Sequence, residues 1–317
     1  MDVVVTCRDD DEISVLLGDG TGTLAPGVTY STGNNTRPED LVLVLLDDDN
    51  FLDAVTANRD GDSISVLYGD GTGVFGVEEE YGAGGRIQGV AAADLDDDGN
   101  LDIVAANRDD DDLSVFIGDG LGGLLAELNV ATPSQQPESV FIADIDDQAG
   151  FDVVWPSSNQ NEVVLHSGDA MGGLGVGAES GVGASPRRIS GGDFNEDGEV
   201  DVVVTNFNGA SVSYLANNGD GTFAAHVTSP VGAQPTWAFV GDFDGDGALD
   251  IVTANNGGGG SLSVLLGDGS GGFAAAVTLD VPSAARSVAA ADLNEDGIPD
   301  FVTTAGGNVG VFLSSAP

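Results

Sequence analysis

The sequence predicts an all-β protein built from repeated four-stranded units, and three observations support this. An acidic motif recurs, with its last aspartate at positions 2, 53, 102, 152, 201, 250 and 300, so that the spacing stays between 49 and 51 residues. The segments between the motifs are short, rich in Val, Ile and Ala, and bounded by turn residues, which is typical of strands. No window shows an apolar period of 3.6 residues over the length of a helix.

Radially repeated four-stranded units of about 50 residues are typical of a β-propeller. We therefore expect residues 1–317 to form one β-propeller domain of seven blades, with the first and last blades incomplete. A flat solenoid would also be repetitive, but it favours a shorter period.

The third unit shows the expected order of elements. A strand of small residues (A) comes first, an acidic loop leads to strand B, a polar tip leads to strand C, and a glycine turn leads to a weaker strand D. The corresponding residues are 86–93, 94–102, 102–107, 108–112, 113–117, 118–123 and 124–130. Small side chains suit strand A because the innermost strands crowd around the propeller axis.

The two ends of the chain fall inside repeats. The chain begins in strand B of its first unit, at residues 2–6, and stops after strand C of its last unit, at residues 309–313. The ring is thus expected either to close with an imperfect seam or to belong to a longer chain, and we expect a domain of a larger protein.

The motif at Asp94–Asp102 reads D-x-D-x-D-G-x-x-D. Oxygen ligands at this spacing suit Ca²⁺, which accepts six to eight of them in a flexible geometry, whereas Mg²⁺ requires a stricter octahedron. The glycine permits the sharp turn, because it has no Cβ to clash at positive φ. Four complete loops predict these metal ligands, in which position 7 offers its backbone carbonyl: Asp94, Asp96, Asp98, Asn100, Asp102; Asp193, Asn195, Asp197, Glu199, Asp201; Asp242, Asp244, Asp246, Ala248, Asp250; Asp292, Asn294, Asp296, Ile298, Asp300.

Two further copies of the motif are degraded. The second repeat keeps Asp47, Asp49 and Asp53, and the fourth keeps Asp144, Asp146 and Asp152, so both are expected to be weaker sites. The sequence thus predicts about four Ca²⁺ ions and up to six. The alternative for each loop is a solvated acidic turn.

Charge excludes several classes of partner. The formal net charge is −45, with eight arginines and no lysine, so we expect neither nucleic acid nor an anionic membrane surface as a partner. Four bound Ca²⁺ ions would still leave a net charge of −37.

One cysteine, Cys7, permits no intrachain disulfide, and no apolar stretch is long enough to span a membrane. Because loops of this kind fit extracellular calcium, we expect a secreted or cell-surface protein whose signal peptide is not in this chain.

The meander places the acidic loops and the glycine turns on one face, and the B–C tips and D–A connections on the other. A protein or carbohydrate ligand is expected on the second face, opposite the calcium loops, because exposed loops on a rigid scaffold usually carry binding. That face holds the tips 8–12, 59–62 and 108–112, and also Arg37, Arg86, Arg187, Arg188, Trp237 and Arg286. For any single residue there, a solvated turn is the alternative.

The sequence gives little support for catalysis, and we do not expect an enzyme. His166 and His226 stand alone and are expected to be partly exposed structural residues. Most carboxylates recur in every repeat, which suits a scaffold better than a unique active site, although spacing alone leaves a glycosidase-like acid pair open. Trp155 is expected in the core, whereas Trp237 is expected either to stack on a sugar or to fill core.

The pattern D-x-[DN]-x-D-G-x-x-D-[IV]-V followed by a Gly-Asp-Gly turn resembles the FG-GAP/VCBS repeat, most clearly at residues 239–252 and 262–273. This resemblance implies a seven-bladed propeller like those of integrin α-subunit heads, some fungal lectins and bacterial surface proteins. The expected function is a calcium-stabilised extracellular binding or adhesion module. The alternatives are a lectin that holds carbohydrate between blades, and a structural or non-catalytic part of a larger secreted protein or enzyme.

Overall fold

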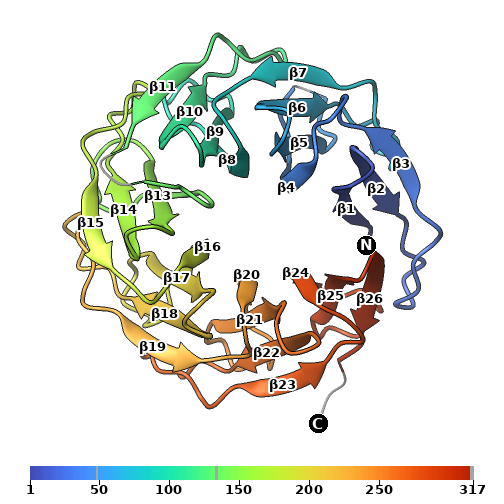
Figure 1. Ribbon diagram of the computed structural model, residues 1–317, viewed down its shortest axis with the longest axis vertical. Helices are drawn as coiled ribbons and strands as arrows, with labels where there is room; N and C mark the ends of the chain where they lie inside the picture. The colour runs from blue at the N-terminus through green and yellow to red at the C-terminus, as the bar shows by residue number, and fades with distance from the viewer. Residues whose placement is uncertain (48, 133–134, 315–317) are drawn as a thin grey trace.

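Seven small antiparallel sheets form a ring around an axis, in a computed structural model that describes residues 1–47, 49–132 and 135–314 (Figure 1). Five sheets have four strands, and the first (β1-β2-β3) and last (β24-β25-β26) have three. No helix occurs in these ranges, and thus none that could cross a membrane. The prediction of an all-β, seven-bladed propeller with incomplete first and last blades is confirmed.

The innermost strands (A) surround the axis and are β4 (Pro38–Val44), β8 (Ile87–Ala93), β12 (Phe141–Ala143), β16 (Pro186–Gly192), β20 (Pro235–Gly241) and β24 (Ala285–Ala291). The B strands are β1 (Val3–Cys7), β5 (Asp53–Asn58), β9 (Asp102–Asn107), β13 (Asp152–Ser157), β17 (Asp201–Asn206), β21 (Asp250–Asn255) and β25 (Asp300–Ala305). The C strands are β2 (Glu12–Leu16), β6 (Ser63–Leu67), β10 (Asp112–Phe116), β14 (Glu162–His166), β18 (Ser211–Leu215), β22 (Ser261–Leu265) and β26 (Asn308–Phe312). The outer D strands are β3 (Val28–Ser31), β7 (Glu79–Gly82), β11 (Leu128–Ala131), β15 (Ala178–Gly181), β19 (Val227–Pro230) and β23 (Val277–Asp280).

The core lies between neighbouring blades. Val55 and Ala57 of β5, for example, pack with Ile103 of β9 and Phe116 of β10 in one buried cluster. Because both faces of the B strands are covered by adjacent blades, β5, β9, β13, β17 and β21 are buried along their whole length.

The outer strands are shorter than the sequence predicts. In the third blade, residues 124–130 were expected as a strand, but β11 begins only at Leu128. Leu124 instead forms an isolated bridge with Gly118. The bridge closes the glycine turn before the chain reaches the outer edge of the blade.

The ring closes at the seam between the last and first blades through a contact that it also uses elsewhere. In each case a glycine N–H of the C–D turn donates to a carbonyl in the acidic loop of the preceding blade. The pairs are Gly172 to Leu95 (3.2 Å), Gly271 to Phe194 (3.0 Å) and, across the seam, Gly22 to Leu293 (3.0 Å). Figure 1 accordingly shows the N-terminus beside β26.

Candidate functional site

The four complete acidic loops join strand A to strand B, and the backbone of each loop holds its own acids in place. In the third blade, Gly99 N–H donates to Asp94 Oδ2 at 2.8 Å. Asp98 N–H donates to Oδ1 of both Asp94 (3.1 Å) and Asp96 (3.2 Å). Asn100 N–H in turn donates to Asp98 Oδ1 at 2.8 Å. The acids at positions 1, 3 and 5 are therefore fixed by the turn itself.

The other complete loops repeat this pattern closely. The N–H of position 6 donates to the first acid, at 3.0 Å for Gly198, 3.0 Å for Gly247 and 2.8 Å for Gly297. The N–H of position 7 donates to the fifth-position aspartate at 2.9 Å in Glu199, Ala248 and Ile298. Whether the carbonyl of position 7 binds metal remains a prediction.

Glycine at position 6 serves the backbone conformation of the loop. Gly99, Gly198, Gly247 and Gly297 have φ between 86° and 97°, and a Cβ on any of them would meet no atom within 4 Å. Conformation, and not lack of space, therefore selects glycine there. The predicted turn is confirmed. Position 4 also has positive φ, at Gly245 (80°) and at Asp97 (60°), Glu196 (58°) and Glu295 (60°), and only Gly245 signals this in the sequence.

Three loops bring carboxylate oxygens close enough to share one ion, with ligand atoms within 4.8 Å of one another. These groups are Asp94–Asp96–Asp102, Asp242–Asp244–Asp246 and Asp144–Asp146–Asp152, the last of which belongs to a degraded loop that was expected to be a weaker site. The donor set consists of hard oxygens, which suits Ca²⁺. In the loops 193–201 and 292–300, Asn195 and Asn294 replace the second acid. Within the described residues, Asp47, Asp49 and Asp53 form no such group.

The last aspartate of each motif also has a structural role that the sequence did not predict. One carboxylate oxygen accepts the N–H of the first residue of the C–D turn, and the other accepts the N–H of the second residue of the acidic loop. For Asp102 these donors are Gly118 (2.8 Å) and Leu95 (2.7 Å). The first bond occurs for all seven motif aspartates, Asp2, Asp53, Asp102, Asp152, Asp201, Asp250 and Asp300, and the second for all but Asp2.

We call this pair of bonds the aspartate clamp. Burial raises the pKa of Asp53, Asp102, Asp152, Asp201 and Asp250, while the backbone N–H donors oppose that rise. Each oxygen of Asp102 and Asp250 accepts one N–H and keeps a second lone pair, whereas Oδ2 accepts a second hydrogen bond in Asp152 and Asp201 and only Oδ1 keeps one there. The clamp is therefore compatible with metal binding by the same carboxylate.

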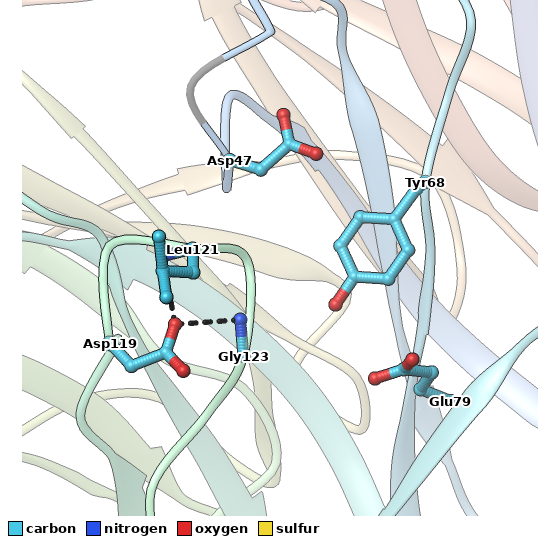
Figure 2. Close-up of a pocket in the computed structure, with 6 residues that line it drawn as sticks. All are labelled: Asp47, Tyr68, Glu79, Asp119, Leu121 and Gly123. Carbon is cyan, nitrogen blue, oxygen red and sulfur yellow. Dashed lines mark hydrogen bonds between the residues drawn. The ribbon is translucent and has the colours of Figure 1, made fainter.

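A pocket of about 360 Å³ lies between the second and third blades, lined by Asp47, Tyr68, Glu79, Asp119, Leu121 and Gly123 (Figure 2). The Tyr68 hydroxyl donates to the Gly122 carbonyl at 2.8 Å, which ties one blade to the next. Asp119 accepts the N–H groups of Leu121 and Gly123 at 2.8 and 2.9 Å. The pocket thus offers one aromatic face and several carboxylates.

All eight arginines lie where strand A begins or strand B ends, on the face opposite the acidic loops, which we call the arginine face. Arg8, Arg59 and Arg108 directly follow B strands, Arg37 and Arg86 directly precede A strands, and Arg187, Arg188 and Arg286 lie near the starts of β16 and β24. The N–H of Arg59 donates to the Arg37 carbonyl at 3.3 Å, so the two kinds of position are adjacent. The predicted division of the loops between two faces agrees with this placement.

One ion pair spans the propeller axis. Arg188 Nη1 of β16 lies 2.5 Å from Asp40 Oδ2 of β4, on opposite sides of the ring in Figure 1. The Arg188 guanidinium also lies 3.6 Å from the centroid of the Trp237 ring. The exposed fraction of the Asp40 side chain is 1%, so this contact braces the inner strands.

The two histidines lie in different environments. His166 is buried, with 1% of its surface exposed, so the expectation of partial exposure is wrong for it. It ends β14, which is buried from Val163 to His166, and its ring stacks on Trp155. His226 is half-buried and bonds the Gly181 carbonyl at 2.7 Å. Trp155 is fully buried, as predicted.

Comparison with known proteins gives a family and a fold. The FG-GAP-like repeat matches residues 46–105, 193–253 and 242–303, together more than half of the chain. No curated protein sequence matches.

Three similar solved structures share the fold at low identity. An Agrocybe aegerita lectin, described as recognising non-reducing terminal N-acetylglucosamine, has TM-score 0.61 and 16% identity, with 95% of this chain and 87% of the lectin covered. Virginiamycin B lyase from Staphylococcus aureus has TM-score 0.70 and 12% identity, with coverage of 99% and 92%. A putative 6-phosphogluconolactonase from Bacteroides uniformis has TM-score 0.70 and 14% identity, with coverage of 97% and 89%.

Proposed function

Because this chain belongs to the FG-GAP-like repeat family, we propose that it is a calcium-stabilised binding module, secreted or displayed at the cell surface, that meets a protein or glycan ligand through its arginine face. The observation that carries the proposal is the convergence of carboxylate oxygens in the acidic loops. A bound Ca²⁺ supplies positive charge that offsets the repulsion among these acids. Metal binding then adds to folding stability, since the unfolded chain has no preformed site.

The residues that would hold the ions are those of the four complete loops, together with Asp144, Asp146 and Asp152. The remaining degraded loop, with Asp47, Asp49 and Asp53, is the weakest candidate. About four to six ions are therefore proposed. The module is proposed to be non-catalytic, because its carboxylates recur from blade to blade and its two histidines lie in different environments.

A lectin is the second candidate, and the pocket beside Tyr68 is the observation that favours it. An aromatic face together with carboxylate acceptors suits a sugar ring, and a lectin is among the proteins that share this fold. The equivalent residue in the other blades is not aromatic, as with Leu17, Ile117, Ser167 and Leu266. The proposal therefore predicts one such site per chain.

A matched pair of variants tests the calcium sites. Asp96 belongs to a convergent group, whereas its neighbour Asp97 is exposed and outside that group. Asp96→Asn and Asp97→Asn remove the same charge from the same loop. By titration calorimetry of chelator-treated protein with CaCl₂, we expect Asp96→Asn to lose about one bound ion and Asp97→Asn to keep the wild-type stoichiometry. Equal calcium binding by both variants and the wild type would show that this loop is not a metal site.

A further inference from the structure

The positive charge of this protein is confined to one face. All eight basic residues belong to the arginine face, in a chain of formal net charge −45. Most of them pair with a nearby carboxylate, as Arg108 pairs with Glu138 at 2.8 Å and Arg188 with Asp40 at 2.5 Å. An arginine without a carboxylate partner is therefore an exception on this face.

The densest group surrounds Glu39, at the start of β4. Arg8 Nε lies 3.0 Å and Arg59 Nη1 lies 3.7 Å from Glu39 Oε2. Arg37 and Arg286 act on the same carboxylate electrostatically, and all three of Arg8, Arg37 and Arg286 oppose the rise in the Glu39 pKa that burial causes. We call Arg8, Arg37, Arg59, Arg286 and Glu39 the Glu39 cluster.

The charges in this cluster do not balance. Arg37 pairs with Asp60 at 3.2 Å and with Asp9 at 3.6 Å, and Arg59 also lies 3.7 Å from Asp60. Four arginines thus face three carboxylates, which leaves one positive charge. Arg286 accounts for it, because within the described part of the chain no carboxylate lies within 4 Å of its guanidinium, and its side chain is exposed.

The buried Nε atoms of Arg8, Arg37 and Arg59 make no well-aligned hydrogen bond with any described residue, although those of Arg8 and Arg59 lie 3.0 Å from Glu39 Oε2 and 3.7 Å from Asp60 Oδ1. Arg86 and Arg187 share this state, so the position of Arg286, and not the Nε atoms, distinguishes the cluster. Burial lowers the pKa of Arg8, Glu39 and Asp9 oppose this change, and Arg37 and Arg286 add to it, so both of these arginines lie close enough to Arg8 to repel it.

The surroundings restrict what can bind. The tips on the same face expose Asp9, Asp10, Asp60, Asp62 and Asp109. These acids repel an extended polyanion, whose many charges would lie against them. A small ligand with one carboxylate meets the uncompensated charge and avoids most of that repulsion.

We propose that the Glu39 cluster binds the carboxylate of a small, singly charged ligand, with Arg286 as its main charge partner and Arg8 and Arg59 beside it. Guanidinium groups suit this task because their planar fork matches a carboxylate. The inference rests on the proposed function, since it assigns a ligand class to the same face. Sugar acids and acidic peptide groups both carry this chemistry.

The test is a binding titration of calcium-loaded protein with three probes: glucuronate, N-acetylglycine and neutral glucose. We expect at least one of the two acids to bind, and glucose to bind at least about tenfold more weakly, since a charged hydrogen-bonded contact contributes about that factor. Binding of glucuronate alone would identify a sugar acid, and binding of N-acetylglycine alone a peptide carboxylate. The proposal is wrong if neither acid binds at 10 mM, about ten-thousandfold above a micromolar dissociation constant, or if glucose binds equally well.

Two variants locate the site. Arg286→Gln removes the unpaired charge from an exposed position, so the fold should persist, which its melting curve checks. Arg86→Gln is the control, since Arg86 lies on the same face in the third blade, beside Asp109 at 3.9 Å. We expect Arg286→Gln to weaken binding of the acid about tenfold and Arg86→Gln to leave it unchanged. Equal effects of the two variants would overturn the assignment. Retained calcium-dependent melting with no acid binding would defeat this inference and leave the proposed function intact.

Discussion

His166 shows how the surroundings of one buried side chain fix the tautomer of its neutral ring. Its Nδ1 donates to the Gly175 carbonyl at 2.7 Å, so Nδ1 carries the proton. Its Nε2 is buried and has no hydrogen-bond partner among the described residues. The ring stacks on Trp155 with 6.2 Å between centroids. Burial lowers the pKa of His166 below its ordinary value of 6.5.

This environment predicts a pH dependence of stability. The unfolded chain takes up a proton at His166 below about pH 6.5, whereas the folded protein resists it, so the contribution of His166 is complete above that pH and is lost as the pH falls toward the lowered pKa. We expect the stability difference between wild type and His166→Gln to shrink from pH 7.5 to 5, by at most about 1.4 kcal/mol per unit. Urea unfolding at several pH values measures it, and a difference independent of pH would contradict this reading.

For single residues, the sequence predicts a role where the chemical nature of the side chain determines that role. Glycine at position 6 of each loop signals positive φ, and the structure agrees at Gly99 and Gly247. Asp97 adopts a similar conformation without any glycine. The burial of His166 follows from the packing that covers β14 from Val163 onward, and one isolated histidine carries no signal of that.

The aspartate clamp is the feature that organises each blade. One buried carboxylate, such as Asp250, joins the acidic loop through Phe243 N–H (2.7 Å) to the C–D turn through Gly267 N–H (2.8 Å). The constant spacing of the last aspartate therefore reflects blade geometry as well as any metal. Backbone donors leave no mark on the sequence, so the motif alone indicated a ligand and not a clamp.

The clamp and the metal role can be separated by two substitutions in one loop. Asp250→Asn places an amide where both oxygens accept N–H groups, which leaves a buried donor opposed to a donor, so we expect a loss of about 2 kcal/mol in both calcium and chelator. Asp246→Asn keeps an acceptor for the Ala248 N–H and lies at an exposed position. We therefore expect it to lower the free energy of unfolding in calcium, because a proposed metal ligand is removed, and to leave it unchanged in chelator. Chemical denaturation in the two buffers distinguishes them. If the effect of Asp250→Asn disappears in chelator, the clamp has no structural role of its own.

At the scale of the whole molecule, the fixed 50-residue period was sufficient to predict a seven-bladed ring, because each repeat is one blade that must bury its faces against its neighbours. The contacts that close and brace the ring were not predictable in the same way. Gly22 meets Leu293 across the seam, and Arg188 meets Asp40 across the axis. Such pairs are far apart in sequence and have no local pattern, so they emerge only once the ring is built.

The central proposal for this protein, whose formal net charge is −45, is that its acidic loops bind Ca²⁺ and that this binding stabilises the fold. Thermal unfolding of the wild-type protein in CaCl₂, in MgCl₂ at the same concentration and in chelator tests it most directly. Each site held at a hundred times its dissociation constant adds about 2.7 kcal/mol, so several sites predict a rise in Tm on the order of 10 °C in calcium over both other buffers. Melting curves that coincide in all three buffers would contradict the proposal that the acidic loops bind calcium.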